Sequence, residues 1–314
     1  MDLLFNASVI SSAIRIATPL LLAALGCILC EKAGITNLAI EGFMLMGSFI
    51  SIAYITKSDG SVLVAMLVAM VGTMVYSGLF GLVVIRFQAN QVVTSIAMNM
   101  LSVGLTTFLL QAMLGAQGMI RPANIQKIPN MQVDILEKIP FIGSIFHNQN
   151  FIVPLAILMA VGLHFVIKKT VYGLNVVSLG ESEGAARSAG ISVKRVQWSV
   201  ILISGLFCGL AGAYLSSVIL SEFSMNMVQG RGFTAYTAVI FGNTNAILVW
   251  LVTLLFGWAE AIGVQIELAG MGIPSSVVKM FPYVLAIVVL MISSVSAKYK
   301  KEKRLENKAK GTGR

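Results

Sequence analysis

Long apolar segments recur along this chain, and they limit what it can fold into more than any other feature. Each run of about 18 or more residues with few charges is long enough to cross roughly 30 Å of hydrocarbon as a helix. The runs do not alternate apolar and polar residues, which excludes a membrane β-barrel. Only 11% of residues are charged, against roughly a quarter in soluble proteins. The sequence therefore predicts an all-α, polytopic membrane protein.

We expect about eight full spans and one short element. The predicted spans cover residues 9–29, 37–55, 61–85, 92–114, 150–167, 197–219, 246–263 and 279–296. A further apolar element at 232–242 is too short to cross alone as a straight helix. We interpret it as a half-helix lined by protein or by a water-filled cavity. The N-terminus lacks a basic region and a small-residue cleavage site, so we expect no removable signal peptide.

Lysine and arginine set the expected orientation. The tail 298–314 holds eight of them in 17 residues, and the segment 168–196 holds five. Positive loops stay in the cytoplasm, so we place both segments there and the 115–149 loop and the N-terminus outside. The chain thus divides into a transmembrane domain at 1–297 and a basic cytoplasmic tail. We interpret the net charge of +9 as a topology signal rather than as nucleic-acid binding, with membrane lipid as a partner of the tail.

The cysteines and histidines give no indication of a metal site. Cys27, Cys30 and Cys208 are interpreted as small apolar core residues, because no further Cys or His lies at ligand spacing. His147 and His164 are isolated in the sequence. For His164 we favour packing between helices over a proton relay.

The charged segment 173–196 is too polar to cross a lipid core and too long for a simple turn. Ser182 is a predicted N-cap, Glu183 suits the positive end of a helix dipole, and Gly190 suits the left-handed position after a helix. The helix between them has about seven residues and is too short to be stable alone. It therefore has to dock on something; the alternative is a solvated loop with a frayed turn.

The stretch Gly173–Val193, GLNVVSLGESEGAARSAGISV, resembles the coupling loop of ATP-binding-cassette (ABC) importer permeases. The similar branch of that family serves branched-chain amino acids, ribose-type sugars and nucleosides. Other stretches also resemble it: Thr18–Phe49 (with G-x-x-N-L-x-I-E-G at Gly34–Gly42), Asn90–Asn99, Gly230–Asn243 and Phe281–Leu285. The resemblance covers roughly residues 15–295 and is strongest to nucleoside or simple-sugar permeases. The extra N-terminal span of ribose-type relatives is missing, which favours the nucleoside branch.

The resemblance implies an ABC importer permease fold in which the short cytoplasmic helix fits a groove on an ATPase subunit. Ala185, Ala186 and Ala189 are expected to form one small-residue face there. The residues expected at this contact are Gly180, Glu181, Glu183, Ala185, Ala186, Arg187, Ala189 and Gly190. The implied partners are the ABC ATPase, a second permease subunit that is a paralogue and makes a heterodimer, and an extracytoplasmic solute-binding lipoprotein.

The absence of nucleotide-binding motifs agrees with ATP being bound by a separate subunit. The chain has no G-x-x-x-x-G-K-[ST] and no Gly-Lys dipeptide, so it is not itself a P-loop ATPase. We expect no covalent chemistry and no cofactor in this chain, with ATP and Mg bound by the partner ATPase. The 115–149 loop is also too small to form a two-lobed solute-binding domain.

Polar residues within the apolar segments are candidates for a translocation pathway. The candidates are Asn37, Glu41, Asn90, Gln91, Asn99, Gly230, Arg231 and Gly232. Interrupted elements in the two halves of a transporter often flank the pathway, and here these are 34–42 and 230–243. Their polar groups either line a path or bond across helices as structural glue, and the sequence leaves both open. Arg231 is alternatively an anchor at the outer surface, and Arg15 is discounted because it can snorkel.

The leading interpretation is the permease subunit of an ABC importer for nucleosides, with a simple-sugar importer as the alternative. A secondary transporter or channel is the main rival outside that family. It would use Glu41, Glu260 or His164 as ion-coupling groups. An integral-membrane enzyme ranks third, because no nucleophile or metal constellation is present.

Overall fold

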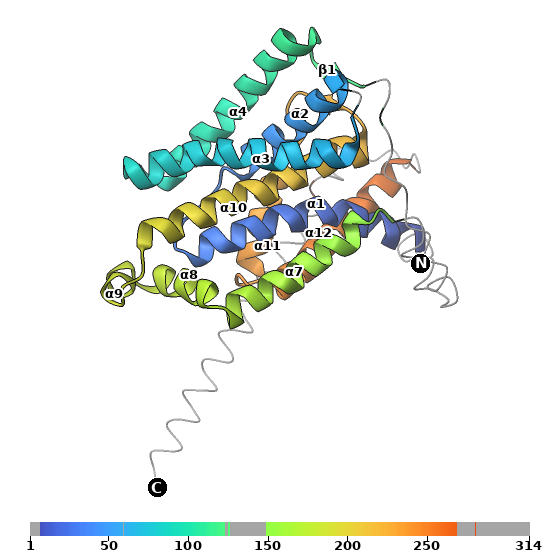
Figure 1. The fold of residues 1–314 in the computed structure, drawn as a ribbon. Coiled ribbons are helices and arrows are strands. Elements are labelled where there is room, and N and C mark those ends of the chain that lie inside the picture. The colour runs from blue at the N-terminus through green and yellow to red at the C-terminus, as the bar shows by residue number, and fades with distance from the viewer. Residues whose placement is uncertain (1–6, 59, 123–124, 126–148, 269–279, 281–314) are drawn as a thin grey trace.

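A computed structural model describes residues 7–58, 60–122, 125, 149–268 and 280. In this part the chain is almost entirely helical (Figure 1). The helices are α1 (Ala7–Lys32), α2 (Ile40–Ser58), α3 (Val62–Gly81), α4 (Gln91–Leu114), α7 (Ile152–Lys169), α8 (Val171–Glu181), α9 (Glu183–Ser188), α10 (Val193–Tyr214), α11 (Arg231–Phe241) and α12 (Ala246–Leu268). Two π-helical turns, η1 (Leu82–Arg86) and η2 (Leu215–Leu220), extend α3 and α10. The strands β1 (Met119–Ile120) and β2 (Phe223–Ser224) form one antiparallel pair.

Six helical segments of the described residues are long and apolar enough to cross a membrane. They are Val9–Lys32, Val62–Arg86, Gln91–Leu114, Ile152–Lys169, Val193–Leu220 and Ala246–Glu267. Each coincides with a predicted span. The predicted span at 37–55 corresponds to α2, which has Glu41 in its first turn and Lys57 in its last and is not among the six. The predicted span at 279–296 and the tail lie outside the described residues.

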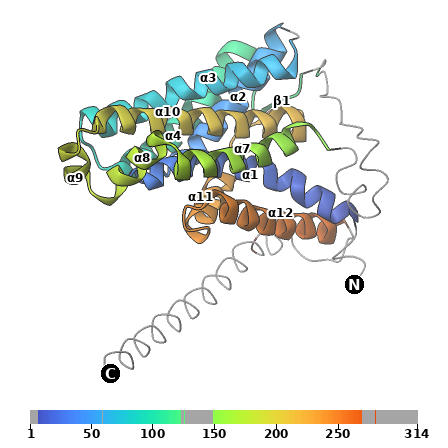
Figure 2. The same ribbon diagram turned by 60° about the horizontal axis from the view of Figure 1, so that its bottom comes forward.

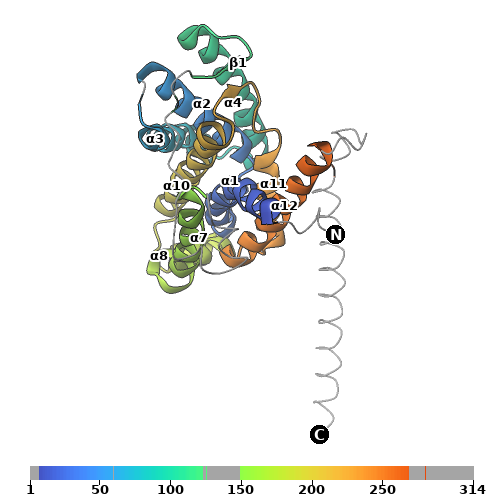
Figure 3. The same cartoon turned by 90° about the vertical axis from the view of Figure 1, so that its right-hand side faces the viewer.

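The helices form two groups that meet at α10. On one side α10 packs against α2 and α3, and α4 packs on α2; on the other side α1 contacts α10, α7, α11 and α12. Figure 3 shows this division, with α10 between the two groups. Glycines allow the backbones to approach closely: a Cβ atom added at Gly212 would lie 2.0 Å from the carbonyl oxygen of Met44. Such small-residue contacts are typical of packed membrane helices.

The outer surface of α4 is apolar. Val93, Met100 and Phe108 are 65%, 72% and 66% exposed in this single chain. A contiguous apolar face of this kind is unfavourable in water, whereas hydrocarbon or another membrane-embedded subunit satisfies it. The face therefore agrees with a chain that crosses a bilayer.

One end of the bundle carries the short helices α8 and α9, and we refer to it as the α9 end. α1 ends there at Lys32, α7 ends there at Lys169, and α10 begins there. Figure 2 shows α9 projecting beyond the long helices.

Candidate functional site

Two interrupted elements meet inside the bundle. The backbone between α1 and α2 is largely non-helical over residues 33–39, and α11 has only 11 residues, about 16 Å of helix. The carboxylate of Glu41, in the first turn of α2, accepts hydrogen bonds from the backbone N–H groups of Gly230 and Gly232, each at 2.7 Å. A side chain of α2 therefore caps the N-terminus of α11. The two interrupted elements, 34–42 and 230–243, are therefore in direct contact.

Both glycines are required by the geometry of this junction. Gly230 has φ +86°, in the left-handed region that L-residues rarely adopt. A Cβ atom at Gly232 would lie 2.5 Å from Cα of Glu41, which is far inside van der Waals contact. The two backbones thus touch directly at this point.

An ion pair ties the same helix end to α12. Nη2 of Arg231 lies 2.5 Å from Oε1 of Glu260, and the two side chains are 25% and 29% exposed. Arg231 is therefore paired with an acidic side chain of its own chain. The pair holds the start of α11 between α2 and α12.

Polar side chains of α4 supply hydrogen-bond partners for the non-helical backbone at 36–39 and for the free N–H groups in the first turn of α2. Gln91, Ser95 and Asn99 are spaced four residues apart, so they lie on one face of the helix. The bonds are Thr36 N to Gln91 Oε1 (2.7 Å), Leu38 N to Ser95 Oγ (3.1 Å), Gly42 N to Asn99 Oδ1 (2.8 Å) and Asn99 Nδ2 to Leu38 O (3.0 Å). Non-helical backbone at membrane depth needs such partners. Ser95 was not singled out from the sequence, although its spacing from the two amides indicates the role.

The remaining amide candidates have structural contacts. Asn37 has no exposed surface; its Nδ2 donates to Ser204 Oγ (3.2 Å) and its Oδ1 accepts from Ala39 N (3.0 Å). Asn90 is the N-cap of α4 and accepts from the N–H groups of Val92 and Val93. Both therefore act as structural groups in this conformation.

The charged segment between α7 and α10 folds into two helices rather than one. Ser182 accepts from Ala185 N (3.3 Å) as the N-cap of α9, and Gly190 has φ +81°; both predictions are confirmed. The preceding helix α8 was not predicted. It begins at the N-cap Thr170, which accepts from Gly173 N (3.1 Å).

Glycine explains how α8 is fixed to the bundle. A Cβ atom at Gly180 would lie 2.0 Å from the carbonyl oxygen of Lys32. The end of α8 therefore rests directly on the end of α1. The helix α9 follows at once in the chain, after the N-cap Ser182.

Ala185 and Ala186 of α9 and its C-cap Ala189 do not form one external face, so that expectation is wrong. Ala186 is 2% exposed. It lies on the side of the six-residue helix that packs against its own chain. Ala185 and Ala189 are exposed and remain available to a partner. Arg187 pairs with Glu183 at 2.6 Å along the exposed side, a contact that contributes little stability.

The cysteines are buried, as predicted, and all three are free thiols. Cys27, Cys30 and Cys208 have no exposed surface. Sγ of Cys30 contacts the carbonyl oxygen of Val200 at 3.6 Å. They occupy the α1–α10 interface as small core residues.

Comparisons with known proteins agree with this architecture. The family model described as "Branched-chain amino acid transport system / permease component" matches residues 9–290. The nucleoside ABC transporter permease protein NupC of Lactococcus lactis subsp. cremoris (strain MG1363) is 33% identical over 294 residues, 90% of this chain and 91% of that one. The guanosine ABC transporter permease protein NupQ of Bacillus subtilis (strain 168) is 32% identical over 303 residues, which are 92% of this chain and 93% of that one.

A relative with a different stated substrate is also similar. The putative glucose ABC transporter permease protein TsgC13 of Haloferax volcanii is 28% identical over 262 residues, 82% of this chain and 77% of that one. No solved structure gives a significant match.

Proposed function

We propose, from the premise that the chain belongs to the branched-chain amino acid transport system permease family, that it carries nucleosides across the cell membrane. The chain is the permease subunit of an ABC importer, a multi-pass membrane protein and a non-catalytic transport subunit. Membership implies ATPase and solute-binding partners. It also removes the ion-coupled transporter and the membrane enzyme from consideration.

The nucleoside assignment is supported by the two relatives at 32–33% identity over nine tenths of this chain, which are named for nucleosides and guanosine. A nucleoside is neutral, so its path needs no unpaired charge, and Arg231 is neutralised by Glu260. Simple sugars are the second candidate, favoured by the similarity to the putative glucose permease. Uptake by the reconstituted importer, with nucleosides and free sugars in competition, separates the two.

We place the α9 end in the cytoplasm and the N-terminus outside. The support is the clustering of basic side chains at that end: Lys32 closes α1, Lys168 and Lys169 close α7, and Lys194 begins α10. Positive residues at the ends of spans favour the cytoplasmic side. In this orientation α11 is a half-helix, and together with the loop before it α11 counts as one crossing. Added to eight full spans (α2 and the predicted span at 279–296 included), it places the N-terminus outside and the basic tail in the cytoplasm.

The α8–α9 segment is proposed to couple the permease to the ATPase. Its support is geometric: α9 projects from the bundle, exposes Ala185 and Ala189, and is joined to α1 by the contact of Gly180 with Lys32. ATP and Mg are then bound by the partner, and nucleotide-driven movement reaches α1 and α10 through α8 and α9.

The junction of α2 and α11 is our candidate for the pathway. The observation that supports this candidate is the hydrogen bonding of Glu41, in the first turn of α2, to the backbone at the start of α11. A second permease subunit, proposed to be a paralogue, completes the pore. Co-purification from native membranes tests the assembly: the ATPase, a second permease and a lipoprotein should be recovered with this chain, and recovery of this chain alone contradicts it.

A further inference from the structure

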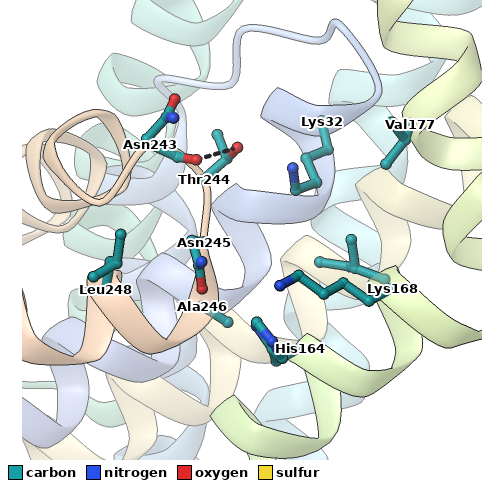
Figure 4. A pocket seen from close by; sticks show the side chains of 10 residues that line it. Lys32, His164, Lys168, Val177, Asn243, Thr244, Asn245, Ala246 and Leu248 are labelled. Atoms are coloured by element: carbon teal, nitrogen blue, oxygen red, sulfur yellow. Dashed lines mark hydrogen bonds between the residues drawn. The ribbon is translucent and has the colours of Figure 1, made fainter. Parts of the chain in front are cut away.

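A cavity of about 290 Å³ opens at the α9 end of the bundle. It lies between the last turn of α7, the end of α1, the side of α8 and the turn that joins α11 to α12. None of the residues used in the junction or in the exposed part of α9 lines it. Figure 4 shows side chains from α1 and α7 directed into the space in front of Asn245.

The charge in this cavity is of one sign. Lys32 and Lys168 both line it, and His164 lies beside them. Within the part of the chain that the structure describes, neither lysine has a salt bridge to a carboxylate, and no acidic side chain lines the cavity. Two ammonium groups beside one cavity repel each other unless an anion lies between them. His164, which is partly buried, therefore faces this polar cavity.

The opposite wall supplies a further attraction for an anion. Asn243 and Thr244 have φ +47° and +54°, and a β-branched residue in this region is a true outlier. This turn brings the chain round so that α12 begins at the cavity, with Ala246 and Leu248 in its lining. The N-terminus of a helix of 23 residues carries positive partial charge. Unusual backbone of this kind gathers at binding sites.

Lysines near the ends of α1 and α7 also complement the negative ends of those helices. That role explains each lysine singly. It does not explain why the C-terminal ends of α1 and α7 and the N-terminus of α12 all lie beside one open cavity. An anion satisfies all of these features together.

We propose that this cavity binds a phosphate-bearing anion between Lys32, Lys168 and the first turn of α12. Lysine binds phosphate as a point charge, and basic pockets between membrane helices bind lipid head groups. The anion is either the head group of an anionic lipid or a soluble phosphate. Val177 of α8 lines the same cavity, so the anion would lie next to the helix that leads into α9.

The test uses the full importer with its partner subunits in nanodiscs. Nanodiscs of phosphatidylcholine alone are compared with a mixture of phosphatidylcholine and phosphatidylglycerol, and native mass spectrometry measures the retained phosphatidylglycerol. The double variant Lys32→Gln/Lys168→Gln should retain it roughly tenfold less well, as expected for lost charge-assisted bonds. The matched control Lys169→Gln/Lys194→Gln removes the same charge at the same end but outside the cavity, and should retain it as the wild type does.

A second arm identifies the source of the phosphate. Inorganic phosphate is added to the importer in phosphatidylcholine alone, and thermal unfolding is followed. A stabilisation that disappears in Lys32→Gln/Lys168→Gln supports the site with a soluble anion as its ligand. The single variant Lys168→Gln changes an exposed side chain, so it should fold and still weaken binding. Equal losses in the cavity variant and the control, or no response to either phosphate source, would overturn the proposal.

Discussion

The carboxylate of Glu41 caps α11 at Gly230, 189 residues away along the chain, with Oε1 of Glu41 2.7 Å from the glycine nitrogen. Replacing Glu41 by Ala removes this bond and the one to Gly232. Hydrogen bonds to a charged group each contribute about 1.5–3 kcal/mol, so for two bonds we expect the permease to lose about 3–6 kcal/mol of stability and to lose transport. Glu41→Gln keeps an acceptor oxygen and should recover part of both. Thermal unfolding followed by size-exclusion chromatography measures the first effect, and an unchanged midpoint in Glu41→Ala would contradict the capping role.

The amide of Asn99 should matter more than that of Gln111, although both lie on α4. Asn99→Ala leaves the N–H of Gly42 and the carbonyl of Leu38 without their partner. Hydrogen bonds between membrane helices contribute about 1–2 kcal/mol in model peptides, so a loss of that size is expected. Gln111 is exposed, and Gln111→Ala should unfold at the wild-type temperature. Equal effects of the two substitutions would contradict the role of Asn99 as a hydrogen-bond partner of Leu38 and Gly42.

The contrast between Asn99 and Gln111 shows what spacing alone can predict. Both are amides inside a predicted span, but they are twelve residues apart in α4 and do not share a face of the helix. The relevant set, Gln91, Ser95 and Asn99, was readable from its four-residue spacing. The backbone groups that these side chains bond to were not predictable, because the conformation of the chain between α1 and α2 depends on tertiary contacts.

The spans were predictable because apolar length indicates them, and the family resemblance supplied the hypothesis of a coupling segment at 173–196. The helix α8 was missed because Gly173 and Gly180 lower helix propensity. Each glycine is nevertheless needed where another backbone approaches. The inward orientation of Ala186 was not predicted either. The sequence of a six-residue helix does not indicate which side will be buried, because this depends on tertiary packing.

Substitutions at two neighbouring alanines of α9 test docking to the ATPase separately from folding of the permease. Ala185 is the third helical residue after the N-cap Ser182, so Ala185→Glu creates a capping box and should not destabilise the permease. It places a carboxylate on the exposed side and should abolish recovery of the ATPase in a pull-down. Ala186→Glu instead buries a charge in the chain's own core, which typically costs several kcal/mol, and should lower the unfolding temperature of the permease alone.

Ala185→Glu is the informative member of this pair. Normal ATPase recovery and normal uptake in that variant would contradict the assignment of α9 as the docking helix. A low unfolding temperature for Ala185→Glu would contradict its exposed position.

Orientation is tested by thiol labelling. The native thiols of Cys27, Cys30 and Cys208 are fully buried, so their background should be small. A cysteine in place of the exposed Ser188 should react with an impermeant reagent only in inside-out vesicles. One in place of the exposed Gln117 should react only in right-side-out vesicles. The reverse pattern would contradict the placement of the α9 end in the cytoplasm.

Uptake by the reconstituted importer tests the central claim most directly. The complex of this chain with its ATPase, second permease and binding protein is placed in vesicles, and labelled guanosine, adenosine and uridine are supplied in the presence and absence of ATP. We predict ATP-dependent accumulation of nucleosides that excess unlabelled ribose or glucose does not reduce. Accumulation of a free sugar with nucleosides ignored would contradict the nucleoside assignment, and nucleoside uptake that proceeds equally without ATP would contradict the coupled mechanism.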